Sequence, residues 1–262
     1  MIALALVLFV CLALPDTQGH PPLQNRIIGG ENAQLGEFPF VVALWSDMNN
    51  SPYIVCGGSI ISAHFVLTAA HCVDDYNPKL GYYYIQAGIV NWEDKGVRYN
   101  VTKVIGHPNY DAEGDIALLK VAGPIKFTDN IRPVGLPKAT DYLKGGEAVE
   151  AVGWGATNTD PATYPKILHK VVLTVVSYEE CTKQISSAPS PYDQTVLNAT
   201  MVCAGKPKGG VCYGDSGSGL VRGANLVGIV SFGVPCGIGY PDVYTRVSSL
   251  VPWVHKQIKA NS

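Results

Sequence analysis

The stretch Phe40-Val41-Val42-Ala43-Leu44-Trp45 is an uninterrupted apolar run, with Pro39 before it and Ser46-Asp47 after it. Its β-branched and aromatic residues favour a strand, and a short apolar run between turn-forming residues is typical of a buried strand. Comparable runs recur at 65–67, 82–85, 116–119, 171–173 and 226–230. Repeated short strands with turns between them predict an all-β protein of two packed barrels or sandwiches.

Helical periodicity is clear only at the C-terminal end. Apolar residues recur at helix spacing from Leu250 to Ile258, and Ser248 or Ser249 is expected to cap that helix. The chain holds 28 Gly and 18 Pro in 262 residues, which indicates many turns rather than long helices. No low-complexity linker or short repeat divides it, so we expect one compact unit.

The composition excludes two classes of protein. Lys and Arg number 19 against 21 Asp and Glu, which gives a net charge of −2, and no basic run is present. A nucleic-acid partner is therefore not expected. Hydrophobic residues make up 47% and charged residues 15% of the chain, which is too apolar and too weakly charged for a disordered protein.

The N-terminal residues predict the compartment. Residues 2–14 read IALALVLFVCLAL, which is too short to span a bilayer and has the length of a signal-peptide core. We expect residues 1–19 to be a signal peptide; the alternative is a buried N-terminal strand or helix. No later stretch has the length and hydrophobicity of a transmembrane helix, so we expect a secreted product with no membrane partner.

The cysteine count agrees with secretion. Of seven cysteines, Cys11 lies in the expected signal peptide, and the six others predict three disulfides whose connectivity the count alone leaves open. No cysteine pair has the spacing of a zinc site, so we expect no metal or cofactor. Sequons that begin at Asn49, Asn100 and Asn198 are candidate glycosylation sites.

Gly214-Asp215-Ser216-Gly217 is the stretch that first points to chemistry. A serine hydroxyl is a weak nucleophile unless a neighbouring base takes its proton and nearby donors stabilise the oxyanion that forms. Glycines on both sides permit a tight turn that exposes the hydroxyl and directs backbone N–H groups to one point. Taken alone, the tetrapeptide is also ordinary turn sequence.

Two further residues are candidate partners for this serine. His71 lies beside Cys72 in the stretch 68–72, and Asp115 heads the apolar run 116–119. A carboxylate carried into a buried site needs a partner, and an imidazole N–H can supply it. The other histidines are expected to be surface or structural residues: His20, His64, His107, His169 and His255.

From Ile27 to the C-terminus the chain resembles the trypsin/chymotrypsin family of serine proteases. The matching stretches, in the family's order, are RIIGG (26–30), CGGS (56–59), TAAHC (68–72), DIALL (115–119), GWG (153–155), GDSG (214–217) and VY (243–244). The resemblance implies a protease domain over residues 27–262, with two six-stranded antiparallel β-barrels, a C-terminal α-helix and an active site between the barrels.

The resemblance also implies catalytic roles. Ser216 would attack the scissile carbonyl, His71 would take and return the proton, and Asp115 would hold the imidazole and stabilise its charged form. The N–H groups of Gly214 and Ser216 would form the oxyanion hole. Because histidine has a reference pKa of about 6.5, activity is expected to rise as the pH passes about 6 to 7.

Activation by proteolysis is the next implication. Residues 20–26 would be a propeptide that a trypsin-like protease removes by cutting after Arg26. The new ammonium on Ile27 would then pair with Asp215 and order the oxyanion hole and the specificity pocket.

The implied disulfides are Cys56–Cys72, Cys181–Cys203 and Cys212–Cys236. Ser231, Phe232 and Gly233 occupy the place of the edge strand that pairs with the substrate backbone. Phe232 replaces the more usual Trp there.

The specificity pocket departs from the common pattern. Gly210 stands at the pocket base, where the trypsins that cleave after basic residues carry Asp, and Asp242 stands on the wall, where Gly is common. This pairing resembles the brachyurins, the collagenolytic serine proteases of crabs and insects. A wall carboxylate would bind Arg or Lys while a small base admits large apolar side chains, which predicts broad specificity. In the alternative, Asp242 bonds backbone or water and the pocket stays chymotrypsin-like.

Two other departures are relevant to the site. Ser218-Gly219 replaces the usual Gly-Pro, which could loosen the nucleophile loop, and Ile89 stands where trypsins have their first calcium ligand, so no calcium site is expected.

The resulting expectation is a monomeric, digestive-type endopeptidase that acts on proteins and peptides and is open to protein inhibitors. An inactive regulatory homologue is the alternative. A lectin-like β-protein is a third interpretation, but it leaves the serine, histidine and aspartate unexplained.

Overall fold

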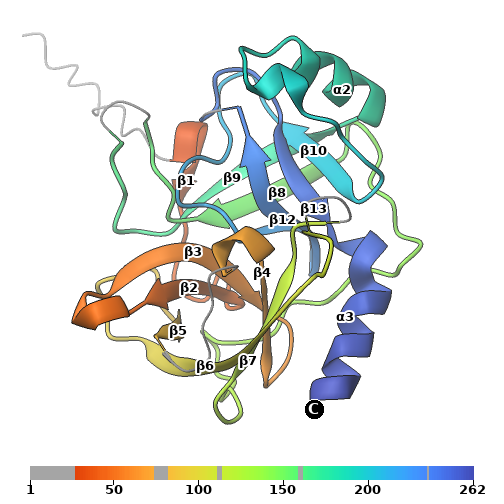
Figure 1. Ribbon diagram of the computed structural model, residues 1–262. Coiled ribbons are helices and arrows are strands. Elements are labelled where there is room, and N and C mark those ends of the chain that lie inside the picture. The colour runs from red at the N-terminus through yellow and green to blue at the C-terminus, as the bar shows by residue number, and fades with distance from the viewer. Residues whose placement is uncertain (1–26, 74–81, 111–113, 159–161, 235) are drawn as a thin grey trace, which may run out of the picture.

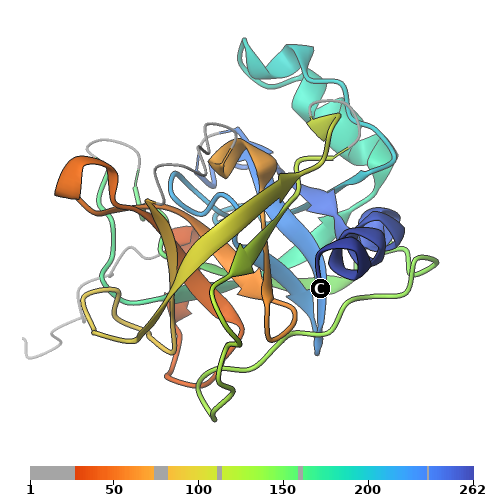
Figure 2. The same cartoon turned by 60° about the horizontal axis from the view of Figure 1, so that its bottom comes forward.

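The computed structural model describes residues 27–73, 82–110, 114–158, 162–234 and 236–262. The expected signal peptide and propeptide, including Arg26, lie outside the described residues. Two closed six-stranded antiparallel β-barrels pack against each other, and a helix follows at the C-terminal end (Figures 1 and 2). This architecture confirms the predicted fold.

The first barrel contains the stretch that predicted it. Its strands, in barrel order, are β2 (Val41–Ser46), β3 (Tyr53–Ile60), β4 (Phe65–Thr68), β7 (Ala117–Val121), β6 (Val97–Gly106) and β5 (Tyr83–Ala87). All six residues of β2 are buried, as expected for an apolar run without alternation. β5 pairs with β2, which closes the barrel.

The second barrel is built in the same way from the C-terminal half of the chain. Its strands, in barrel order, are β8 (Ala148–Gly153), β9 (His169–Val176), β10 (Met201–Gly205), β13 (Asp242–Arg246), β12 (Asn225–Gly233) and β11 (Gly219–Arg222). β11 pairs with β8 to close it, and the two-residue strand β1 (Glu31–Asn32) adds to β9.

Two α-helices lie within the described ranges, and the sequence predicted only one of them. α2 (Tyr178–Ser186) begins at Ser177, whose hydroxyl accepts from the N–H of Glu180 at 3.2 Å. It buries only Cys181 and Ile185, so its apolar periodicity is short and was missed. Short 3-10 turns also occur at Ile27–Gly29 (η1), Met48–Asn50 (η2), Ala70–Cys72 (η3) and Tyr192–Gln194 (η4).

The predicted cap of the C-terminal helix is wrong. α3 (Val247–Asn261) has Arg246 at its N-cap, with no side-chain capping bond. Ser248 lies inside the helix and is buried, and Ser249 donates to the carbonyl of Ala199 instead. The helix therefore begins directly after β13, with Leu250, Val251 and Val254 packed on the first core. No helix in the described ranges has the length and hydrophobicity needed to cross a bilayer.

The two barrels meet at the loops that carry the candidate residues. The N–H of Gly57 on β3 donates to the carbonyl of Ser216 at 2.8 Å, a backbone bond between the barrels. Gly217 has a φ of +75°, and a Cβ there would lie 2.2 Å from the Thr68 hydroxyl. Only glycine fits that position, so the close approach of the barrels depends on it.

Candidate active site

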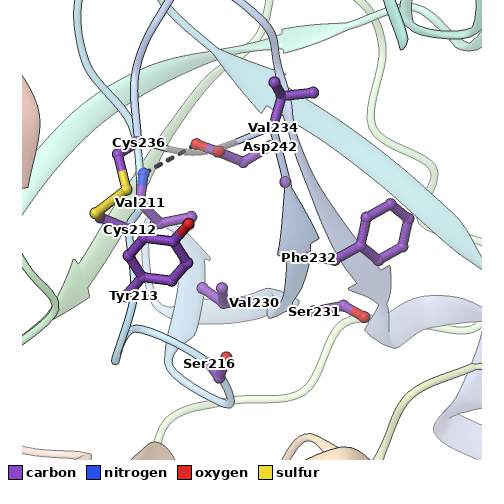
Figure 3. A pocket seen from close by; sticks show the side chains of 11 residues that line it. Val211, Cys212, Tyr213, Ser216, Val230, Ser231, Phe232, Val234, Cys236 and Asp242 are labelled. Atoms are coloured by element: carbon purple, nitrogen blue, oxygen red, sulfur yellow. Dashed lines mark hydrogen bonds between the residues drawn. A yellow bond between two sulfur atoms is a disulfide. The ribbon is translucent and has the colours of Figure 1, made fainter. Parts of the chain in front are cut away.

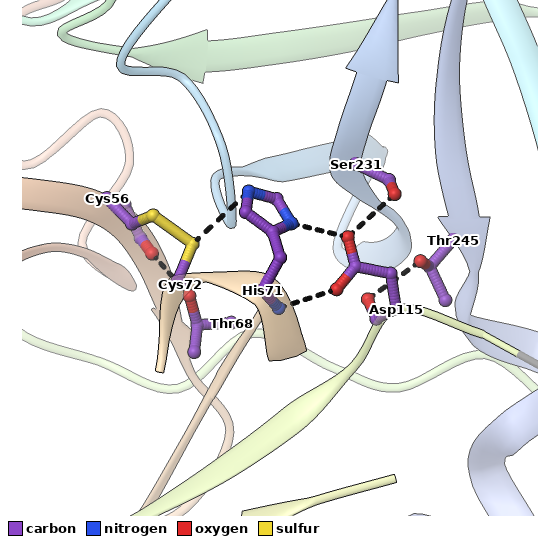
Figure 4. Close-up of polar contacts among 8 residues, drawn as sticks. Cys56, Thr68, His71, Cys72, Asp115, Ser231 and Thr245 are labelled. Atoms are coloured by element: carbon purple, nitrogen blue, oxygen red, sulfur yellow. Dashed lines mark hydrogen bonds and ion pairs between the residues drawn. A yellow bond between two sulfur atoms is a disulfide. The ribbon is translucent and has the colours of Figure 1, made fainter. Parts of the chain in front are cut away.

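His71 is held by Asp115 in two places. The Nδ1 of His71 lies 2.6 Å from the Oδ2 of Asp115, and its backbone N–H donates to Oδ1 at 2.9 Å (Figure 4). η3 carries His71, while Asp115 lies just before β7, so both come from the first barrel. These bonds fix the imidazole plane and place the proton on Nδ1.

The second barrel completes the surroundings of Asp115. Ser231, on β12, donates its hydroxyl to Oδ2 at 2.7 Å, and Thr245, on β13, donates to the backbone carbonyl of Asp115 at 2.8 Å (Figure 4). The Asp115 side chain is only 13% exposed, whereas that of His71 is 36% exposed. The pair therefore has a buried carboxylate and an imidazole that substrate can reach.

The charge on Asp115 is stabilised despite its burial. Burial by itself raises the pKa of this carboxyl, but the hydrogen bonds from His71 and Ser231 outweigh it and hold the pKa below its ordinary value. Asp115 is therefore ionised over the whole pH range in which an imidazole gains or loses its proton. An ionised partner on Nδ1 stabilises the imidazolium that a general base becomes.

Ser216 lies in a cavity that adjoins this pair. The cavity has a volume of about 220 Å³ and is lined by Val211, Cys212, Tyr213, Ser216, Val230, Ser231, Phe232, Gly233, Val234, Cys236 and Asp242 (Figure 3). Ser231 belongs to both groups: it lines the cavity with Ser216 and bonds Asp115. A second link between His71 and Ser216 runs through the Cys56–Cys72 disulfide. Cys72 follows His71 in the chain, and Cys56 precedes Gly57, whose N–H donates to the Ser216 carbonyl.

The turn around Ser216 is built from backbone bonds. Asp215 N–H donates to the Cys212 carbonyl at 3.1 Å, and Ser218 N–H donates to the Asp215 carbonyl at 3.0 Å. Gly214 has a φ of +91°, which favours glycine. Ser218 is 1% exposed, and a Cβ on Gly57 would lie 2.0 Å from its hydroxyl, so the unusual serine fills space that a glycine leaves open.

Asp215 is buried below this turn. Its carboxylate accepts the N–H groups of Gly155 at 2.8 Å and Cys212 at 2.9 Å. Burial raises its pKa to about 6, although both N–H bonds act in the opposite direction. Ile28 contacts the segment that precedes this turn, because its carbonyl accepts the N–H of Gly210 at 3.2 Å.

Of the two specificity residues predicted from the sequence, Asp242 lines the cavity and Gly210 does not. Asp242 lines the cavity, as the first alternative requires, and accepts the N–H of Val211 at 2.9 Å, as the second requires, so these contacts do not select one of the two (Figure 3). Gly210 is not among the lining residues. Its Cα lies behind the carboxylate, and a Cβ there would come 2.4 Å from Oδ2. The room left by Gly210 is thus filled by Asp242.

The predicted disulfides and the remaining histidines can also be located in the structure. The structure has the three disulfides that the resemblance implies, Cys56–Cys72, Cys181–Cys203 and Cys212–Cys236. His64 and His255 are exposed, and His107 and His169 are buried in packing. Cys56, His71 and Cys72 form a group of possible metal ligands, but both sulfurs are joined in a disulfide.

Sequence reasoning missed two functions of residues at this site. Ser231 was assigned to substrate binding alone and Thr245 was not singled out, yet both donate to Asp115. Neither contact has a local signal, because the partners lie 116 and 130 residues apart in the chain.

Comparison with known proteins identifies the family. The Trypsin family model matches residues 27–254. The chain is 34% identical to trypsin delta of Drosophila melanogaster over 89% of each chain. It is 35% identical to trypsin 5G1 of Aedes aegypti, over 97% of this chain and 96% of the relative, and 36% identical to trypsin-1 of Astacus astacus, over 90% and 100%. The chain therefore belongs to the trypsin family of serine proteases.

Proposed function

We propose that this chain is a secreted serine endopeptidase in which Ser216, His71 and Asp115 form the catalytic triad. The observation that carries this proposal is the His71–Asp115 pair, held at 2.6 Å and joined through Ser231 to the cavity that contains Ser216. An imidazole fixed by a buried carboxylate next to a serine in a cavity is the arrangement that nucleophilic acyl transfer needs.

The reaction would proceed in two halves. His71 Nε2 takes the proton of Ser216 as the hydroxyl attacks the scissile carbonyl, and the N–H groups of Gly214 and Ser216 stabilise the oxyanion. The imidazolium then gives its proton to the leaving amine, which breaks the peptide bond and leaves an acyl group on Ser216. Water, activated by the same imidazole, releases the acid and restores the serine.

Substrate would bind as an extended strand along Ser231, Phe232 and Gly233. On one side, β12 pairs with β13 through Phe232 and Gly233. On the other side, its pairing with β11 runs only from Asn225 to Ile229. The end of β12 therefore presents an edge to which a peptide can add, as proteases commonly bind their substrates.

The remaining features fit a secreted digestive protein. Three disulfides suit an oxidising compartment, and the relatives are named as trypsins. Asn100 is exposed on β6 and could carry a glycan, while the Asn198 amide oxygen accepts two bonds from Thr200. η2 contains Asn49. We expect a monomer that protein inhibitors can bind at the β12 edge.

The inactive-homologue alternative is tested by active-site labelling. A fluorophosphonate phosphonylates only a serine whose hydroxyl is activated, with loss of fluoride, so we expect the mature protein to be labelled stoichiometrically at Ser216, with the site read by peptide mass spectrometry. Ser216→Ala should take up no label, while Ser218→Ala, two residues away, should label like the wild type. Mature protein that stays unlabelled would favour a regulatory homologue.

The proposed specificity is broad at P1, the substrate residue whose carbonyl is attacked, with Asp242 binding Arg and Lys. A panel of peptides that differ only at P1 tests this. In Asp242→Gly we expect kcat/KM for Arg and Lys to fall by about 10- to 100-fold, because a partly buried charge pair is lost, while Leu and Phe change by less than about threefold. If Asp242→Gly cleaves after Arg and Lys as fast as the wild type, Asp242 does not bind these side chains. The pocket would then be chymotrypsin-like, and the brachyurin-like assignment would be wrong.

A further inference from the structure

The carboxylate of Asp242 occupies a gap between two glycines. Its side chain is 2% exposed, and a Cβ on Gly210 or on Gly233 would lie 2.4 Å or 2.7 Å from one of its oxygens. Real Cβ atoms do not approach so closely, so the absence of both side chains is what admits the carboxylate. Val211 N–H holds Oδ2, and the residue lines the cavity that contains Ser216 (Figure 3).

The groups that face Asp242 do not include a cation. β10 and β12 present Ala204 and Gly233 in register with it, and the loop before Ser216 presents the backbone of Val211. Two titratable groups interact with it: Tyr244, on its own strand, and Asp215, from that same loop. Among the described residues, no Lys, Arg or His forms an ion pair with Asp242.

These surroundings favour the uncharged acid in the empty pocket. Burial is the largest cause that raises the pKa of Asp242 well above its ordinary value, and the single N–H of Val211 acts against it. The negative charge of Asp215 raises the pKa further in the uncleaved chain, whereas an ammonium on Ile27 in the mature protein would offset that charge and leave burial as the main cause. Buried Tyr244 carries no charge at neutral pH and offers no compensation. The pocket wall can thus be neutral or negative, depending on the pH and on what enters.

We propose that the ionisation of Asp242 selects between two classes of P1 side chain. As a carboxylic acid, the residue leaves a neutral pocket that takes apolar and amide side chains; as a carboxylate, it takes Arg and Lys. This proposal rests on the serine protease function proposed above. It goes beyond a broad pocket, because it makes the preference a function of pH rather than a fixed property of the lining.

The energetic reason is the free energy of burying a charge. A guanidinium that enters the neutral pocket is desolvated without a counterion, so Asp242 must first lose its proton. At a pH below the pKa of Asp242, loss of this proton becomes less favourable, so kcat/KM for Arg falls by up to about tenfold for each pH unit. An apolar side chain instead benefits from the neutral acid, because a buried carboxylate without a partner is unfavourable.

The test compares two peptides that differ only at P1, one with Arg and one with Leu, on the mature protein from about pH 5.5 to pH 9. Titration of the imidazole affects both substrates alike and cancels in the ratio of their kcat/KM values. We expect the Arg/Leu ratio to rise by at least about tenfold with pH and then level off. A peptide with citrulline at P1, which has the size of Arg without its charge, should show no such rise.

Asp242→Asn is the matched variant, since it keeps the size of the side chain and an oxygen for Val211 N–H but cannot ionise. Its Arg/Leu ratio should stay within about twofold across the same range. Because both substrates are measured on one sample, partial unfolding of the variant leaves the ratio unaffected. A flat ratio in the wild type, or a rise that persists in Asp242→Asn, would overturn the proposal. Failure to cleave either peptide would instead refute the protease function itself.

Discussion

Replacing Asp115 by Asn is expected to lower kcat by about 10⁴-fold while the fold is retained. In the wild type, Asp115 accepts from His71 Nδ1, from the His71 N–H and from Ser231. With its oxygen in the place of Oδ1, an amide still accepts the His71 N–H, but its NH₂ group then takes the place of Oδ2, where it faces Nδ1 and Ser231 and favours the tautomer with the proton on Nε2. An imidazole protonated on Nε2 cannot accept the proton of Ser216. The magnitude is the one known for this change in a protease of the same family.

The measurement is kcat for one peptide substrate, on material whose folding is checked by circular dichroism. Asp129→Asn is a suitable control, because Asp129 is an exposed residue paired only with Arg132 among the described residues. That control should keep wild-type activity. Ser231→Ala removes one of the bonds to Asp115 but leaves its charge, so we expect a fall of about tenfold or less. An Asp115→Asn protein within tenfold of wild type would show that His71 does not act as the base.

The fold was predictable wherever burial had produced long apolar runs. The runs singled out in the sequence coincide, to within one residue at the start, with parts of β2, β4, β5, β7, β9 and β12. β6 has no such signal: it reads VRYNVTKVIG, and most of its residues are exposed or half-buried. It is a strand because β5 and β7 supply backbone partners on both sides, which is a tertiary effect that local propensity does not report.

The sequence singled out candidate reactive residues but did not predict the geometry around them. The Ser216 stretch is ordinary turn sequence when taken alone, and its combination with His71 and Asp115 is what makes the three residues candidates. The position of Asp242 depends instead on the absence of side chains at Gly210 and Gly233, which are 32 and 9 residues away along the chain. Sequence reasoning treated Gly210 as an open base, because the side chain that fills the space comes from another strand.

Activation is the second change for which a large effect is expected, and it depends on Asp215. This carboxylate is fully buried and accepts only backbone N–H groups among the described residues. Because its pKa is raised from 3.8 to about 6, its protonated form is favoured in the folded state. The raised pKa therefore contributes at most roughly 3 kcal/mol to the free energy of unfolding. This contribution is fully present below about pH 4 and is lost as the pH rises through about 6. An ammonium beside it would remove that loss.

Residues next to the expected cleavage site contact the loop that leads to the pocket and to Asp215. Ile28 accepts from Gly210, which lies directly behind Asp242, and Lys206 donates to the Gly29 carbonyl at 2.6 Å. Gly210 precedes Asp215 by five residues in the chain, and we expect a free amino group on Ile27 to insert from this side toward the buried carboxylate. Pairing there would hold the turn that carries Gly214 and Ser216, and with it the oxyanion donors.

The precursor with Arg26→Gln, which a trypsin-like protease should not cut, is expected to have a kcat/KM at least about 10²-fold below that of the mature protein. Loss of a buried charge pair of about 3–5 kcal/mol corresponds to a factor of this size. Arg132→Gln, at an exposed arginine, is the control and should be activated normally. The precursor should also lose stability between about pH 4 and 6 more steeply than the mature protein, as urea unfolding at each pH can measure. Uncut Arg26→Gln protein that hydrolyses peptides as fast as the mature form would exclude activation through Asp215, because the oxyanion donors would then be ordered without the new terminus.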